Sequence, residues 1–146
     1  MSPPTSVLFV CNLNRVRSPM AAGLMRRLYG EAIDAESCGL QPSAEIDPLV
    51  VAVMQEVGVD LGGHRPQSID NVAPSRFEVV VALSEEAWPS VEAAGADSDV
   101  EVVRWPTDDP TMTEGSRDVR LDAYRQTRRT LEAWIIDRFG LPPARE

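Results

Sequence analysis

Apolar residues occur along this chain in two alternating patterns, short continuous runs and longer stretches with helical spacing. Ser6–Val10 and Phe77–Leu83 are runs without polar alternation, which is typical of strands covered on both faces of a sheet. Ile33–Ser37 and Val100–Trp105 predict two further strands. The pattern therefore predicts four short strands separated by helical segments.

The predicted helices cover residues of about 18–29, 48–57, 85–94 and 118–139. Asp47 followed by Pro48 is typical of a helix start, and Gly30 and Gly58 are typical of helix ends. Because strands and helices alternate, we expect a single α/β domain over residues 1–146, with a four-stranded parallel twisted sheet and helices on both faces. The ends, residues 1–5 and 141–146, are expected to be frayed.

Composition narrows the class of protein. The chain has 146 residues, of which 43% are hydrophobic and 25% charged, as in globular domains. No apolar run reaches the roughly 20 residues needed to cross a bilayer, and the start lacks the basic region of a secretory signal. Two cysteines do not make a disulfide framework. We therefore expect a cytoplasmic protein, with a monomer favoured and no membrane partner.

The net charge is −9, and every basic residue is arginine. A nucleic-acid partner would require a basic face, so none is expected. The absence of lysine also excludes Schiff-base chemistry and a lysine-type phosphate loop. An anionic ligand would have to be attracted by a local group of donors, and no metal or cofactor is expected.

Such a group of donors follows the first predicted strand, where Cys11, Arg17 and Ser18 have the spacing C-x5-R-S. A loop between a strand and a helix turns its N–H groups inward and forms an anion site, which becomes a phosphate-binding loop when an arginine can grip two oxygens. The positive potential there favours the thiolate of Cys11, the candidate nucleophile. The alternative is a small buried cysteine. The predicted cradle consists of Asn12, Leu13, Asn14, Arg15, Val16, Arg17 and Ser18.

The chain resembles the low-molecular-weight protein tyrosine phosphatase family, including its arsenate-reductase branch. Besides the loop, the resemblance rests on ESCG at Glu36–Gly39, EVGVDLGGHRPQSI at Glu56–Ile69, VVVALSEEA at Val79–Ala87 and TDDP at Thr107–Pro110. It covers nearly the whole chain. The C-x5-R-S loop together with a late Asp-Pro is a specific pair.

The resemblance implies a role for individual residues. Cys11 would attack phosphorus and form a phosphocysteine, Arg17 would clamp two oxygens, and Asp109 would protonate the leaving oxygen. Ser18 would donate to the Cys11 sulfur. Asn14 would fix the loop in a left-handed conformation. The supporting residues for Asn14 would be Ser37 and His64.

Some roles have alternatives. Asp108 is the other candidate acid, although Asp109 precedes the proline as in the family. His64 is either a support of the loop or a base. Trp88 and Trp105 either line the mouth of the site or pack in the interior.

The loop departs from the family pattern at three positions. Leu13 stands where the family usually has glycine, so either the loop differs in shape or Leu13 has a negative φ. Val16 replaces a second loop cysteine. Arg15 adds a charge at the rim, which either contacts substrate or faces solvent.

Thr111 and Met112 stand where tyrosine-specific members have an aromatic pair, which weakens the case for phosphotyrosine.

Arsenate reduction is the main alternative, because arsenate resembles phosphate. The thioredoxin-coupled branch needs two further cysteines, and Ser84 stands where the first is expected, so only a single-cysteine reaction with a low-molecular-weight thiol is open. Cys38 is either a disulfide partner of Cys11 or a buried small residue. The sequence thus favours a metal-independent cysteine-dependent phosphatase acting on a phosphorylated protein or small molecule. Arsenate reduction and a non-catalytic module for tetrahedral oxyanions are the alternatives.

Overall fold

A computed structural model describes residues 4–96 and 98–142 of the chain. Its four strands, all parallel, form one sheet in the order β2-β1-β3-β4, so the first strand lies in the interior of the sheet. The strands are β1 Ser6–Cys11, β2 Asp34–Gly39, β3 Val79–Ala82 and β4 Glu101–Arg104. This confirms the predicted α/β fold with a four-stranded parallel sheet.

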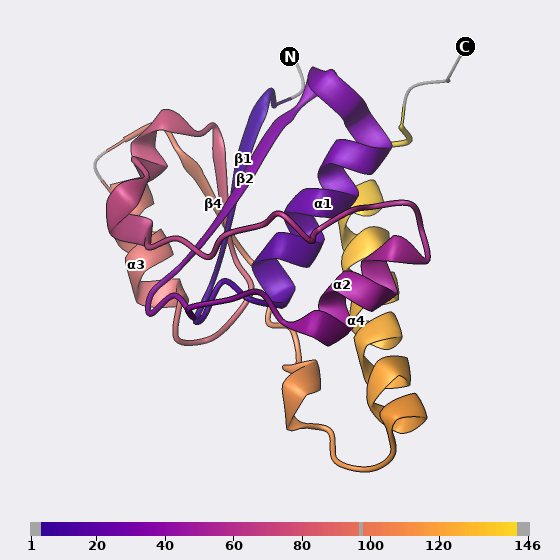
Figure 1. Ribbon diagram of the computed structural model, residues 1–146. Coiled ribbons are helices and arrows are strands. Elements are labelled where there is room, and N and C mark those ends of the chain that lie inside the picture. Colours follow the sequence, from indigo (N-terminus) through magenta and orange to yellow (C-terminus); the bar gives the residue numbers. More distant parts are fainter. Residues whose placement is uncertain (1–3, 97, 143–146) are drawn as a thin grey trace.

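Four α-helices cover the two faces of the sheet (Figure 1). They are α1 Arg17–Tyr29, α2 Pro48–Gln55, α3 Trp88–Ala96 and α4 Arg117–Phe139. Figure 1 shows α1, α2 and α4 on one side of the strands and α3 on the other. The long helix α4 packs against both α1 and α2. None of the helices in the described part of the chain is long and apolar enough to span a membrane.

Local sequence signals account for the helix boundaries. The side chain of Asp47 accepts from the backbone N–H groups of Leu49 and Val50, and Pro48 occupies the first position of α2. The hydroxyl of Ser116 accepts from Val119 N and caps α4 in the same way. Gly30 follows α1 with φ 58°, in the left-handed region that glycine adopts without strain.

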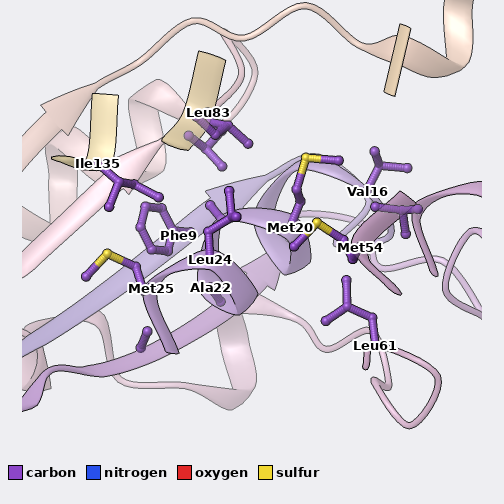
Figure 2. Close-up of a cluster of buried hydrophobic side chains, with 14 of the residues drawn as sticks. Phe9, Val16, Met20, Ala22, Leu24, Met25, Met54, Leu61, Leu83 and Ile135 are labelled. Carbon is purple, nitrogen blue, oxygen red and sulfur yellow. The ribbon is translucent and has the colours of Figure 1, made fainter. Parts of the chain in front are cut away.

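The two faces of the sheet have separate hydrophobic cores. Along β1, Phe9 belongs to the larger core beneath α1, α2 and α4, whereas Val10 belongs to the smaller core beneath α3. Figure 2 shows part of the larger core, where Met20 and Leu24 of α1 lie with Ile135 of α4. Because every position of β1 after Ser6 is buried on one face or the other, the strand has no polar alternation.

The observed boundaries differ from the predicted ones by a few residues. β2 begins at Asp34 and extends to Gly39, beyond the predicted end at Ser37. The frayed start expected for residues 1–5 does not include Thr5, whose N–H and hydroxyl donate to the Glu78 carboxylate. Residues 1–3 and 143–146, which make up most of the two ends expected to be frayed, lie outside the described residues.

Candidate active site

The loop from Asn12 to Val16 joins the carboxyl end of β1 to α1. The chain leaves β1 toward β2 on one side, and β3 lies on the other side of β1. In open parallel sheets, ligands bind at this kind of switch in strand order. The fold therefore places the C-x5-R-S loop where a binding site is expected.

The backbone of the loop is held from outside by the segment that follows β2. Leu40 N donates to Cys11 O, Gln41 N to Asn12 O and Ser43 N to Leu13 O, over 2.9–3.2 Å. Because the carbonyl and the next N–H of a trans peptide point in opposite directions, outward carbonyls leave the N–H groups facing inward. α1 begins at Arg17 without a side-chain cap, so its first amides remain free for an anion.

Cys11 lies at the base of this cradle beside Ser18. The Cys11 sulfur and the Ser18 hydroxyl are 2.9 Å apart, and both side chains are buried. Asn14 Nδ2 donates to the same Ser18 oxygen over 2.8 Å, so this oxygen already accepts one hydrogen bond. Its own hydrogen has two acceptors within reach, the Cys11 sulfur at 2.9 Å and Cys38 O at 3.3 Å, and the sulfur is the nearer. Such a donor stabilises a thiolate.

Asn14 is the centre of a buried hydrogen-bond network. It is the one non-glycine residue with positive φ, 53°, in the described chain, as the sequence predicts for this position. Its Nδ2 also donates to Ser37 Oγ over 3.0 Å, and its Oδ1 accepts from Gln67 N over 2.9 Å. The side chain therefore ties the loop to β2 and to the segment near Gln67.

His64 contacts the loop at the backbone carbonyl of Asn14. Its Nε2 lies 3.2 Å from Asn14 O, which can only accept, so Nε2 carries the hydrogen. Burial lowers the pKa of His64, and the nearby Arg26 charge acts in the same direction, whereas the hydrogen bond to Asn14 opposes them. A neutral His64 that donates to the loop fits support better than proton transfer.

The lowered pKa makes a prediction about stability. Below its ordinary pKa of 6.5, His64 takes up a proton more readily in the unfolded chain than in the fold. The free energy of unfolding should therefore fall as pH drops through 6.5, by at most about 1.4 kcal/mol per pH unit from this group. Denaturant unfolding at several pH values between 7.5 and 5.5 measures the slope. His64→Gln should have a smaller slope, and an unchanged slope would contradict the prediction.

Gly39, the last residue of β2, lies directly against the loop. A Cβ at this position would lie 2.8 Å from both Asn12 O and Asn14 N, closer than real Cβ contacts come. Both neighbours are backbone atoms of the loop, so neither can move aside without changing its shape. Glycine is required here by close approach.

We expect Gly39→Ala to distort the loop and destabilise the fold by about 1–3 kcal/mol, the usual cost of overpacking. Thermal unfolding and phosphate binding by calorimetry measure the two effects. Gly63→Ala is the matched control, because a Cβ at Gly63 meets nothing within 4 Å and its φ is not positive. Equal effects of the two substitutions would contradict the prediction.

Arg17 joins the cradle to the loop that contains Asp109. Arg17 Nη1 donates to Thr107 O over 3.0 Å, and Nη2 lies 3.9 Å from Asp109 Oδ2. One small cavity is lined by Cys11, Leu13, Arg15, Val16, Arg17, Asp109 and Thr111. Asp108 is exposed and lines neighbouring hollows instead. A thiol, an arginine and a carboxyl thus face the same space.

Two of the departures from the family pattern have a structural explanation. Leu13 does not have positive φ, so leucine is accommodated in the loop without left-handed strain. Arg15 Nη2 forms an ion pair of 3.0 Å with buried Asp47, which also accepts from the Tyr124 hydroxyl over 2.8 Å. Arg15 also lines the cavity at Cys11. Its ion pair with Asp47 holds the side chain in place, so Arg15 is not a free surface arginine.

Cys38 is buried on the opposite face of the sheet from Cys11. It pairs with Val10 across β1 and belongs to the core beneath α3, whereas Cys11 belongs to the other core. Both cysteines are free thiols, and burial raises the pKa of Cys38 to about 12, with smaller contributions from Cys11 and Glu36. The arrangement favours the interpretation of Cys38 as a buried small residue.

The two tryptophans considered for the mouth of the site are partly buried and pack against the hydrophobic cores instead. Trp105 contacts the rings of Phe9 and Trp134, with centroids 6.4 Å and 5.8 Å away. Trp88 packs against the core beneath α3. Neither lines the cavity at Cys11.

Sequence reasoning missed Gln67, Asp47, Tyr124 and the Thr111 hydroxyl as parts of the site. Tyr124 is distant in sequence from the loop, so no local pattern marks it. Gln67 lies within the Glu56–Ile69 segment that resembles the family, but its bond to Asn14 comes from its backbone N–H, which leaves no side-chain signal. Asp47 is recognisable as a helix cap, but its second oxygen, which binds Arg15, is visible only in the fold. Thr111 stands next to the Asp-Pro pair and was considered only as a missing aromatic residue.

Comparison with known proteins points to the same family as the C-x5-R-S loop. The sequence model of the family "Low molecular weight phosphotyrosine protein phosphatase" matches residues 6–137. The arsenate reductase of Halalkalibacterium halodurans is 30% identical over 84% of this chain and 86% of that protein. The glutaredoxin arsenate reductase of Synechocystis is 39% identical over 53% of this chain, and this match spans 58% of that protein.

Among solved structures, "An arsenate reductase in the phosphate binding state" superposes with a TM-score of 0.76. It is 27% identical and covers 91% of this chain and 95% of its own. The family match, the loop after β1 and this shared fold agree. The chain therefore belongs to the low molecular weight phosphotyrosine protein phosphatase family, which contains both phosphatases and arsenate reductases.

Proposed function

We propose that this protein is a metal-independent phosphomonoester hydrolase that acts through a phosphocysteine intermediate on Cys11. The observation that carries the proposal is that Cys11, Arg17 and Asp109 line the same cavity. Nucleophile, oxyanion clamp and proton donor are the three groups that ester hydrolysis needs. The phosphate binding state of the 27% identical arsenate reductase supports an oxyanion in this loop.

In the first step, the Cys11 thiolate attacks phosphorus and the bond from phosphorus to the ester oxygen breaks. Asp109 gives its proton to the departing oxygen, so that an alcohol or phenol leaves rather than its anion. Arg17 and the inward N–H groups of the loop hold the three equatorial oxygens, on which the charge of the transition state is spread. The Ser18 hydroxyl stabilises the thiolate as attacking and as leaving group.

In the second step, water attacks phosphorus and the bond to sulfur breaks. The Asp109 carboxylate takes the proton of that water and so returns to its starting form. The products are inorganic phosphate and the Cys11 thiolate. Asn14, with Ser37 and His64 behind it, keeps the loop in one shape through both steps.

Arsenate reduction with an external thiol is the second candidate, and the names of the relatives favour it. Arsenate fits the same cradle because it has the shape and charge of phosphate. Cys38 lies on the far face of the sheet, so a second thiol would have to come from a small molecule or another protein. Such a thiol would attack the Cys11 sulfur of the arsenic adduct. An S–S bond would form and the S–As bond would break with its electron pair left on arsenic, so that arsenite leaves and Cys11 remains in a mixed disulfide, which a further thiol would reduce.

One side-by-side assay separates the candidates. The purified protein is given p-nitrophenyl phosphate with a chelator, and in parallel arsenate with glutathione or with reduced glutaredoxin. We expect phosphate release without metal. Arsenite formation without phosphate release would favour the second candidate. Tight phosphate binding without either reaction would indicate a non-catalytic oxyanion-binding module.

A further inference from the structure

The two carboxyl oxygens of Asp109 have different surroundings. Oδ1 accepts from Thr111 N over 2.9 Å and from the Thr111 hydroxyl over 2.7 Å. Oδ2 accepts no hydrogen bond from the described residues, and its charged neighbour is Arg17 Nη2 at 3.9 Å, beyond hydrogen-bond distance. The carboxyl is therefore anchored through one oxygen and open at the other.

This asymmetry determines where a proton can be held. A neutral carboxyl has one oxygen with hydrogen and one that acts purely as an acceptor. Oδ1 is the acceptor oxygen, because a hydrogen on Oδ1 would clash with the two hydrogens that Thr111 donates to it. The hydrogen therefore belongs on Oδ2, the oxygen on the side of Arg17 and the cavity at Cys11.

Thr111 is well suited to impose this arrangement. It lines the same cavity as Cys11 and Asp109, and it follows Pro110, which begins a short 3-10 turn at Pro110–Met112. Its N–H fixes the position of Oδ1, and its hydroxyl adds a second donor from the side. Without the hydroxyl, the terminal torsion of the aspartate has a broad and roughly two-fold range.

We propose that Thr111 is a positioning residue for the acid, which directs Oδ2 of Asp109, the oxygen that carries the proton, toward the leaving group. The proposal rests on the proposed hydrolase function. Tyrosine-specific members of the family have an aromatic residue at this position, which would supply a stacking surface. In this chain Thr111 would orient the acid instead. Thr111 itself exchanges no proton with the substrate.

The consequence is an effect that depends on the leaving group. Phenyl phosphate needs a proton on its departing oxygen, whereas the leaving group of 2,4-dinitrophenyl phosphate departs readily as the 2,4-dinitrophenolate anion. A misplaced acid slows the first substrate and spares the second. A substitution that merely loosens the fold would slow both alike.

The test compares Thr111→Val, which removes the hydroxyl at nearly constant shape, with Thr111→Ser, which keeps it. The step measured is formation of the phosphocysteine. It is monitored as the burst of phenol in pre-steady-state experiments with excess substrate. For Thr111→Val we expect a roughly 10-fold slower burst with phenyl phosphate, the usual effect of one such hydrogen bond, and little change with 2,4-dinitrophenyl phosphate. Thr111→Ser should restore the wild-type rate. Asp109→Asn removes the acid altogether, so its rate with phenyl phosphate gives the largest slowing to compare with that of Thr111→Val.

A second measurement does not depend on turnover. The ¹³Cγ chemical shift of Asp109 reports the hydrogen bonds of its carboxyl group by NMR, and we expect the same shift in the wild type and in Thr111→Ser but a different one in Thr111→Val. Equal slowing of both substrates in Thr111→Val, or an unchanged carboxyl shift of Asp109, would overturn the role of Thr111. An inactive wild type would instead refute the hydrolase function, and the NMR comparison would then decide the inference by itself.

Discussion

Cys11→Ser is expected to abolish turnover of p-nitrophenyl phosphate, with a loss of at least about 10⁴-fold in kcat, since removal of a nucleophile costs this much or more. The serine oxygen fits the same space beside Ser18, but a hydroxyl is barely ionised where a thiol forms a thiolate. Binding of inorganic phosphate should persist, because Arg17 and the loop amides are unchanged. Steady-state kinetics and calorimetric titration with phosphate measure the two effects.

Cys38→Ala is the matched control for this substitution. It removes the other thiol, which lies in the core on the opposite face of the sheet, and it should keep most of the activity with a modest loss of stability. Phosphatase activity that survived in Cys11→Ser would exclude the phosphocysteine mechanism. Activity lost equally in both variants would indicate a general loss of structure, which melting temperatures would reveal.

Arg17→Lys is expected to lower kcat/KM by about 10³-fold, within the range seen when one oxyanion donor is removed. Lysine keeps the positive charge but has no planar fork, so it cannot hold two oxygens in parallel. It also loses the bond from Nη1 to Thr107 O, which connects the cradle to the acid loop. The loss should therefore appear in kcat as well as in KM, and it should be present with 2,4-dinitrophenyl phosphate too.

Arg129→Lys provides the comparison for Arg17→Lys. Arg129 is exposed on α4 and its side chain contacts Gln126, outside the cavity at Cys11. Its replacement should leave the kinetics as in the wild type. Nearly wild-type activity in Arg17→Lys would show that charge alone suffices and that the two-oxygen clamp is not part of catalysis.

Arg17 has a double task in this geometry. One end of the guanidinium is bound to the backbone of the acid loop, and the rest faces the cradle. An oxyanion bound by Arg17 would lie in the cavity that Asp109 also lines. This connection joins the Asn12–Val16 loop to a loop about 90 residues later, and residues of both line one cavity.

The fold was largely predictable because its signals are local. A strand buried on both faces has a continuous apolar run, as in Ser6–Val10, and a capped helix has a recognisable start, as at Asp47. The exact ends of β2 were not predictable, because its last residues, Cys38 and Gly39, join the sheet through pairing with β1. Pairing partners are distant in sequence and leave no mark on a short segment.

By itself, the sequence determined the α/β class, the loop with Cys11 and Arg17, and the late Asp-Pro pair, since each depends on residues near one another in the chain. Only the tertiary structure decided that Asp109 rather than Asp108 lines the cavity, that Cys38 faces away from Cys11, and that Arg15 is fixed by Asp47. The physical reason is the same in each case. Side-chain direction in a strand or turn changes with a shift of one residue, and only packing against distant segments fixes it.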